Sequence, residues 1–243
     1  MDYTPPTILA IATSSAHCSV ALTHAGKLST LRLAATRGHT SHLLSMTERV
    51  LGDAELQLTD LDALAYSCGP GSFTSARIAS AFTQGLALTA NMAIIAVSNL
   101  HILAQMAYAQ LGCRAVVPCI DAHNQTVYWG LFRCNDAGLT LPMQAEQASA
   151  MAAIVLPPGI PWVGVGEGWI RYGDQMPPLL KQQLQQLYQL PEAQDLEAKA
   201  MIALALHHYR QKQFVAIEEA LPVYLRNDIA QPPRPATLMK DIS

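Results

Sequence analysis

Charged side chains are scarce in this sequence. Only 14% of its 243 residues are Asp, Glu, Lys or Arg, whereas 51% are hydrophobic, and the formal net charge is −3. A chain with so many apolar residues folds around a core and does not have the composition of a disordered protein. The small negative net charge does not favour strong nonspecific binding to nucleic acid. Because little charge is left for the surface, we expect some apolar surface to meet a partner.

Cysteine patterns that would build a disulfide framework or a zinc site are also missing. The number of cysteines is odd, and no two of them have C-x-x-C spacing. The five are Cys18, Cys68, Cys113, Cys119 and Cys134. Buried free thiols in a reducing compartment are the expected state. Residues 1–6 lack the basic region of a signal peptide, so we expect a cytoplasmic protein.

Residues 78–113 contain no charged side chain and are long enough to span a bilayer. Polar residues and a glycine interrupt this stretch at Gln84, Gly85, Asn91, Ser98, Asn99, His101 and Gln105. The pattern fits a helix over 74–90, a buried strand over 93–97 and a helix over 99–111 better than one continuous span. The sequence therefore predicts no membrane segment.

The whole pattern predicts two α/β lobes of similar plan. Runs of apolar or alternating residues predict strands over 7–12, 18–23, 27–34, 63–68, 115–120, 126–132 and 163–169, with a turn over 14–17. Further helices are predicted over 39–51, 178–190 and 195–212. We assign residues 1–104 to a first lobe with the order βββαβα, 105–226 to a second lobe, and 227–243 to a proline-containing tail.

A glycine-rich turn links the predicted strand 63–68 to the helix 74–90. It consists of Gly69, Pro70, Gly71, Ser72, Phe73 and Thr74. The glycines permit conformations that a Cβ hinders, proline stiffens the turn, and Ser72 or Thr74 is expected to cap the helix. Free N–H groups at a helix start suit an anion, but such a turn suits equally a tight reversal without a ligand. Its apolar surroundings favour the reversal.

The helices 39–51 and 74–90 carry unusually little charge. Arg77 is the only charged residue of the second, and the first contains only Glu48 and Arg49. In the helix 74–90 a bulky stripe of Ile78, Phe82 and Leu86 lies opposite a stripe of small residues. We expect the bulky stripe to fill the core and the small stripe to let another helix approach.

Two arrangements of this helix pair are open. The helices cover each other within one lobe, or the pair also packs against another protein chain. The shortage of charge favours the second arrangement, because the centres of protein interfaces are depleted in charge. The candidate interface residues are His39, Leu43, Met46, Thr47, Val50, Ala76, Ser80, Thr83 and Ala87.

No set of residues forms a recognisable catalytic or metal site. His39 and His42 are three residues apart, but no carboxylate or third histidine lies at a suitable spacing. Cys18 and Cys68 lack an identifiable activating base. Asp121 follows a strand, where a turn-forming role is as good an explanation as a catalytic one. We therefore expect neither a catalytic residue nor a bound metal.

Six ordered motifs resemble the bacterial TsaB (YeaZ) family, and the resemblance covers residues 8–226. They are Ile8–Ser14 (I-L-A-I-D-T-[AS] in the family), Cys18–Leu22 (its second strand), His39-Thr40 (H-[TS]), Gly69–Thr74 with Arg77-Ile78 (G-P-G-S-F-T-G-[LV]-R-I-G), Ile120–Ala122 with Val127-Tyr128 (I-D-A-R and [EV]-V-Y), and Pro222–Arg226 (P-x-Y-L-R). The glycine motif is highly specific, and the ordered series is more specific still.

The resemblance implies an α/β, duplicated actin-like ATPase (ribonuclease H-like) fold, whose two lobes each hold a mixed sheet flanked by helices. It implies a non-catalytic scaffold subunit in the formation of N6-threonylcarbamoyladenosine at position 37 of tRNAs that read ANN codons. The implied partners are the transferase TsaD, bound through the helices 39–51 and 74–90, and the ATPase TsaE. The same helices support homodimers when TsaD is absent. ATP, metal and threonylcarbamoyl-adenylate then belong to the partner subunits, and tRNA is reached through the complex.

Three positions depart from the family pattern. Ala12 stands where the family usually has Asp, and in catalytic relatives an acid there helps to hold metal and nucleotide. Its loss argues against ATP chemistry. Ser75 and Ala79 replace glycines but stay small, so close helix packing survives. The alternative function is an ATP-dependent enzyme or a metallopeptidase-like protein of the same superfamily, which would need the acids or the nucleophile that this sequence does not display.

Overall fold

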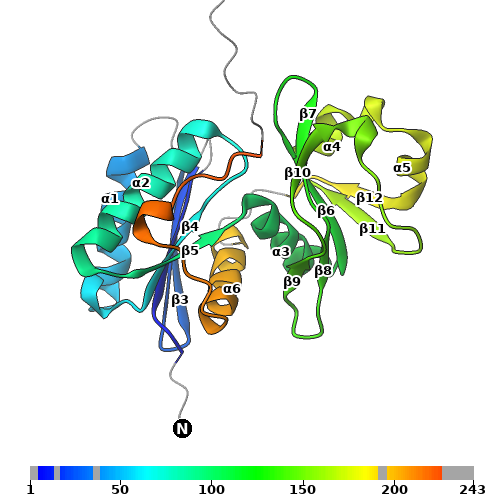
Figure 1. The fold of residues 1–243 in the computed structure, drawn as a ribbon. Coiled ribbons are helices and arrows are strands. Elements are labelled where there is room, and N and C mark those ends of the chain that lie inside the picture. Colours follow the sequence, from blue (N-terminus) through cyan, green and yellow to red (C-terminus); the bar gives the residue numbers. More distant parts are fainter. Residues whose placement is uncertain (1–4, 14–16, 35–38, 191–195, 226–243) are drawn as a thin grey trace, which may run out of the picture.

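A computed structural model describes residues 5–13, 17–34, 39–190 and 196–225 as two lobes, each built on one mixed β-sheet (Figure 1). The first sheet has the order β3-β2-β1-β4-β5. Its strands are β1 (Ile8–Thr13), β2 (His17–His24), β3 (Lys27–Ala34), β4 (Ala63–Ser67) and β5 (Ala93–Val97). The first three strands pair antiparallel, whereas β1, β4 and β5 pair parallel. Residues 14–16 of the predicted turn and the predicted tail 227–243 lie outside the described residues.

The second sheet repeats this plan with the order β10-β7-β6-β11-β12. Its strands are β6 (Ala115–Asp121), β7 (Thr126–Trp129), β10 (Gln147–Ala150), β11 (Trp162–Val165) and β12 (Leu184–Tyr188), and β8 (Phe132–Cys134) and β9 (Thr140–Pro142) extend it from β6. Here too the first three strands pair antiparallel and β6, β11 and β12 pair parallel. The matching order and directions confirm the duplicated actin-like fold.

Helices cover both faces of the first sheet and lie between the two sheets, whereas α4 and α5 lie on the side of the second sheet that faces away from the first lobe (Figure 1). They are α1 (His39–Asp53), α2 (Phe73–Ala90), α3 (Asn99–Leu111), α4 (Glu167–Arg171), α5 (Pro178–Gln183) and α6 (Leu196–Arg210). Short 3-10 turns occur at Leu58–Asp60, Met151–Ala153, Gly173–Gln175 and Ile217–Glu219. None of the helices in the described part of the chain is long and apolar enough to cross a membrane.

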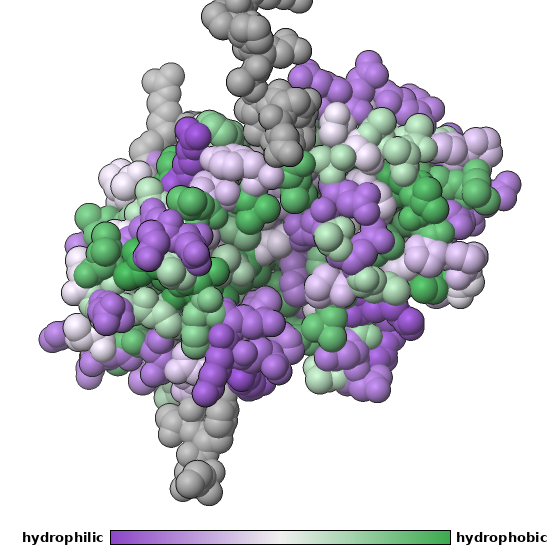
Figure 2. Space-filling view, viewed as in Figure 1, coloured by the Kyte–Doolittle hydropathy of each residue, from purple (hydrophilic) through white to green (hydrophobic). Residues whose placement is uncertain are grey.

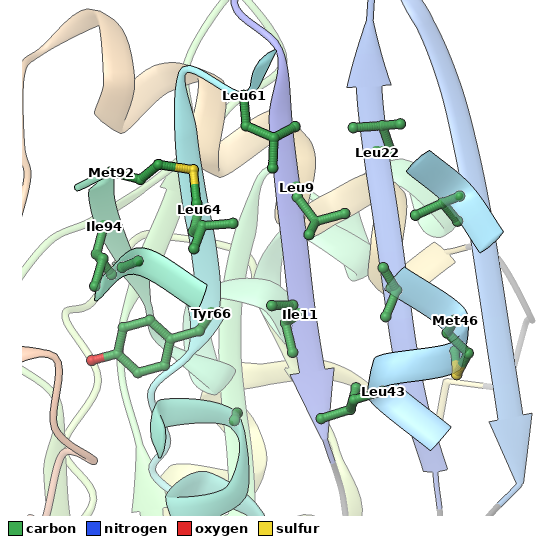
Figure 3. Close-up of a cluster of buried hydrophobic side chains, with 14 of the residues drawn as sticks. Leu9, Ile11, Leu22, Leu43, Met46, Leu61, Leu64, Tyr66, Met92 and Ile94 are labelled. Atoms are coloured by element: carbon green, nitrogen blue, oxygen red, sulfur yellow. The ribbon is translucent and has the colours of Figure 1, made fainter. Parts of the chain in front are cut away.

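Alternation along β1 divides the first lobe into two layers of core. Leu9 and Ile11 face α1 and α2, where Figure 3 shows them with Leu43 and Met46 of α1. Ile8, Ala10 and Ala12, which alternate with them, belong to the cluster that also contains residues of α6. A strand that is covered on both faces must be apolar throughout, which explains the unbroken run of β1.

The position of α6 corrects the predicted boundary between the lobes. This helix was assigned to the second lobe, residues 105–226, but Met201 and Leu204 pack onto the first sheet. The chain then stays with the first lobe, since Val215 forms an antiparallel bridge with Ile94 of β5. The physical reason is that α1 and α2 cover only one face of the first sheet. Its other face is lined by small residues such as Ala10, which leave room for a helix.

Several predicted elements have different ends or types in the structure. The predicted helix 178–190 is helical only to Gln183, and β12 follows. Its glutamines favour a helix locally, but pairing with β11 overrides that preference. The predicted strand 163–169 ends at Val165 and is followed by α4, and the predicted strand 126–132 is divided into β7 and β8. The short strands β9 and β10 were not predicted.

Candidate docking surface on helices α1 and α2

Hydrogen bonds within the first lobe hold the turn Gly69–Thr74 in place. Ser72 caps α2, as predicted, by accepting a hydrogen bond from the Ser75 N–H at 3.5 Å. Asn99 fixes the other side of the turn, because its backbone N–H donates to the Gly69 carbonyl at 2.8 Å and its Nδ2 donates to the Pro70 carbonyl at 3.0 Å. The φ of Gly69 is +94°, in the region that favours glycine. These contacts support a tight reversal rather than an anion cradle.

The predicted faces of α2 are reversed in the structure. Eight of the nine candidate interface residues are buried inside the lobe: Leu43, Met46, Thr47, Val50, Ala76, Ser80, Thr83 and Ala87. The ninth, His39, is half-buried. The small stripe lies inward because it lets α2 approach the sheet closely, so that the Thr13 hydroxyl of β1 donates to the Ser75 carbonyl at 2.6 Å. The bulky stripe of Ile78, Phe82 and Leu86 is only partly buried.

Residues 214–225 form a segment, here called the C-terminal strap, that lies along α2 (Figure 1). It is held by hydrogen bonds from Ser80 Oγ to the Ala220 carbonyl, from Gln84 Nε2 to the Ile217 carbonyl (2.7 Å), from the Tyr66 hydroxyl to the Leu221 carbonyl (3.0 Å), and from the Val223 N–H to the Cys68 carbonyl (2.7 Å). A part of the uncharged surface of α2 is therefore covered by the chain itself. Sequence patterns gave no sign of this contact.

The outward side of α2 lines a groove of about 570 Å³ beside the start of α1. Its lining residues are Thr40, Phe73, Thr74, Arg77, Ile78, Ala81, Phe82, Gly85 and Leu86. Large apolar side chains of the same two helices are also exposed, with Leu44 of α1 at 48% and Leu88 of α2 at 69%. Figure 2 shows hydrophobic residues gathered over α2 and the C-terminal strap, interrupted by hydrophilic ones. Such a surface is typical of a site that another protein covers.

An arginine that contacts two aromatic side chains lies at the rim of the groove. The Arg77 guanidinium lies 3.7 Å from the centre of the Phe73 ring, and its Nε donates to the Tyr224 hydroxyl at 3.0 Å. The Phe73 and Tyr224 rings are 5.3 Å apart. Phe73 and Tyr224 belong to separate sequence motifs, and their contact was not predicted because 151 positions (224 − 73) separate them in the chain.

The thiols are poorly suited to nucleophilic chemistry. Cys18 lies 2.9 Å from His39 Nδ1, a pairing that the sequence did not reveal. Burial raises the pKa of Cys18 to about 11, and it raises the pKa of Cys68 to about 12. Both thiols are therefore protonated at neutral pH, and the thiolate is the reactive form. Among the residues described, no three His, Cys, Asp or Glu side chains gather closely enough to hold a metal ion.

Asp121 acts as an anchor for its own turn. Its carboxylate accepts hydrogen bonds from the Tyr172 hydroxyl and the His123 N–H, each at 2.8 Å, and lies 3.1 Å from Arg171 Nη1. Its side chain is only 6% exposed. These partners support the turn-forming role that the sequence analysis weighed against a catalytic one.

A cavity of about 500 Å³ lies at the junction of the lobes and is lined by His101, Ser98, Glu146 and His208 among others. His101 on α3 bonds the Thr140 carbonyl through Nε2 at 2.6 Å. The pKa of His101 is lowered from 6.5 to about 4, mainly by burial and to a smaller extent by the neighbouring His208 and His207, and the hydrogen bond to the Thr140 carbonyl opposes the shift. His101 is therefore neutral in the folded protein at pH 7.

We expect His101 to make the fold sensitive to acid. Its folded pKa lies below its unfolded one, so its contribution is fully present above about pH 6.5 and is lost as the pH falls toward 4. The shift predicts a loss of roughly 3 kcal/mol in the free energy of unfolding. Urea unfolding across this range is to be compared with that of His101→Gln, which keeps an N–H for the Thr140 carbonyl but does not titrate. Equal pH slopes in the two proteins would contradict the prediction.

Comparison with known proteins places this geometry in a family. The family model described as "TsaD: tRNA N6-adenosine threonylcarbamoyltransferase" matches residues 33–167. The tRNA threonylcarbamoyladenosine biosynthesis protein TsaB of Escherichia coli K12 is 37% identical over 235 residues, which cover 92% of this chain and 96% of that protein. The chain belongs to the TsaB family. TsaB of Haemophilus influenzae is 34% identical over 231 residues, which cover 92% of this chain and 94% of that protein.

A solved structure agrees with this assignment to the TsaB family. The structure of YeaZ from Pseudomonas aeruginosa superposes with a TM-score of 0.79 at 37% identity, covering 90% of this chain and all of that one. Two of the motifs that carry the family resemblance meet at the rim of the groove, where Arg77 touches Tyr224. The groove is therefore built from segments that carry the family's motifs.

Proposed function

We propose that this chain is a non-catalytic scaffold subunit of the complex that forms N6-threonylcarbamoyladenosine at position 37 of ANN-decoding tRNAs. It binds a TsaD transferase through the groove and the exposed surface of α1 and α2. TsaE joins these two, and tRNA meets the chain only through the complex. Membership of the TsaB family supports the pathway, and the apolar groove is the observation that supports the binding mode.

The surface of α2 has the composition of an interface core. Arg77 is its only charged residue. The groove is lined by bulky apolar side chains, such as Phe82, that are only partly buried. Interface centres are depleted in charge and enriched in aromatic residues and arginine. Covering this groove by helices of a partner would remove its apolar area from water, which is the main driving force for association.

The interior of the first lobe supports a non-catalytic role. Ala12, at the position of the usual acid, is 2% exposed and packs in the cluster beneath α6. A methyl group offers no oxygen to a metal or to a phosphate-bound cation. In this proposal ATP, metal and threonylcarbamoyl-adenylate are therefore bound by the partner subunits, and the chain works beside them in the cytoplasm.

Mixing the purified chain with TsaD of the same organism tests the proposal. We expect a one-to-one complex on size-exclusion chromatography with light scattering, formed at the expense of any homodimer of the chain alone. Threonylcarbamoyl transfer to tRNA is expected to need TsaD and to increase when the chain is added. The proposal is wrong if no complex forms, or if the isolated chain binds Mg-ATP tightly or transfers the group without TsaD.

A further inference from the structure

We propose that Phe73, Arg77 and Tyr224 form a carboxylate-recognition site at the rim of the groove. The occupant is an amphipathic helix of the partner protein, which lays apolar side chains in the groove and directs one Asp or Glu carboxylate at Arg77. This inference rests on the proposed function and deepens it, because it states what the partner must carry at one point of the interface.

The charge of Arg77 is the first argument. It is exposed, and within the described part of the chain it forms no ion pair. The rest of the groove is uncharged, and Arg49 on α1 already lies 3.8 Å from Asp53. A partner that covers the groove takes the Arg77 guanidinium partly out of water. An uncompensated buried charge is costly, so a fitting partner supplies a carboxylate there.

The fixed orientation of Arg77 is the second argument. The Phe73 ring supports one face of the guanidinium, and the Tyr224 hydroxyl accepts the Nε hydrogen. An arginine held at its Nε keeps its terminal N–H groups for a planar, bidentate acceptor such as a carboxylate. Because less side-chain freedom remains to be lost on binding, this arrangement favours affinity.

The C-terminal strap supplies the tyrosine and holds it in place. The Val223 N–H, one residue before Tyr224, donates a hydrogen bond to the carbonyl of Cys68, the residue that directly follows β4. Arginine and tyrosine are the residue types that most often dominate interface energies, and here they are joined across two distant segments. Tyr224 is therefore a positioning residue, which acts on the partner through Arg77.

The dissociation constant of the complex with TsaD, measured at several salt concentrations, tests the inference. Arg77→Glu is expected to weaken binding by about tenfold or more and to flatten the salt dependence, since a close charge pair is lost. Arg77→Gln removes the charge but keeps an N–H donor near the position of Nε, so it guards against misfolding, and we expect the same direction of change. Tyr224→Phe is expected to weaken binding by about threefold while keeping the salt dependence, because the cation remains.

Rescue by charge reversal decides between this inference and a merely structural role. We expect one Asp→Lys or Glu→Lys variant on the TsaD helices to bind the Arg77→Glu chain with restored affinity. The same TsaD variant should bind the unchanged chain more weakly than unchanged TsaD does. A second copy of this chain is the alternative occupant, and Glu48 on α1 is the carboxylate that it would direct at Arg77. The double variant Arg77→Glu with Glu48→Lys tests it: if the second change restores a homodimer and not the complex with TsaD, the inference is overturned. Wild-type affinity and salt dependence in both Arg77 variants also overturn it, yet leave the proposed function standing. If the unchanged chain forms no complex, the proposed function itself fails.

Discussion

Replacing Ala81 by glutamate is expected to prevent the complex with TsaD while leaving the fold intact. Ala81 is exposed on α2 and lines the groove, so the new side chain points into the surface that we assign to the partner. The new carboxylate lies one helical turn from Arg77 and takes the guanidinium that we assign to the carboxylate of the partner. The partner's carboxylate then has no counter-charge in the covered groove, which costs roughly 3 to 5 kcal/mol and raises the dissociation constant by about a hundredfold or more. Isothermal titration calorimetry or biolayer interferometry measures this change.

Ala109→Glu is the matched control for this experiment. Ala109 is an exposed alanine of α3, outside the groove, so the same substitution adds the same charge to a different helix. Both variants should keep the free energy of unfolding within about 0.5 kcal/mol of the unchanged protein, as exposed substitutions usually do. Normal TsaD binding by Ala81→Glu, or an equal loss in both variants, would remove the groove from the proposed interface.

The choice of Ala81 depends on the structure. A charge on the small stripe, for example Thr83→Arg or Ala76→Glu, would have been the natural test of the interface predicted from sequence. Thr83 is 0% exposed and Ala76 is 7% exposed, so a charge at either position enters the core of the first lobe. Such variants report on folding and cannot separate a lost interface from a lost fold.

Gly166→Ala is expected to be the most destabilising single methyl group that can be added in the second lobe. Gly166 joins β11 to α4 with a φ of +113°. A Cβ built there would lie 2.4 Å from the Cys119 carbonyl oxygen of β6 and 2.9 Å from Leu103 Cδ2 of α3. Strain and steric overlap act together, so we expect the free energy of unfolding to fall by about 3 to 5 kcal/mol. Urea unfolding followed by circular dichroism measures it.

Gly159→Ala separates the two causes. Its φ is +75°, but no atom lies within 4 Å of the added Cβ, so only backbone strain remains. That strain is worth about 1 kcal/mol. If both variants lower the free energy of unfolding equally, the close approach of β6 and α3 to Gly166 contributes nothing to the loss and the prediction is wrong.

Much of the fold could be predicted from local patterns. The helix over 99–111 and the strand over 93–97 have the predicted ends, because a serine cap, an αL residue and an unbroken apolar run mark them within a few residues. The prediction failed where distant strands overrule local preference. The segment 184–188 pairs with β11 despite its glutamines, and no signal inside the segment records that neighbour.

The candidate site shows the same division. The sequence by itself determined that α1 and α2 carry almost no charge, that the turn Gly69–Thr74 starts α2, and that the motifs are those of the TsaB family. It also determined that α2 has one bulky and one small stripe. Which stripe faces inward was decided only by the tertiary structure, because a helix that lies close to a sheet needs small residues at the contact. The strap that carries Tyr224 to Arg77 was decided there too, since a contact across 147 residues leaves no periodic trace in either segment.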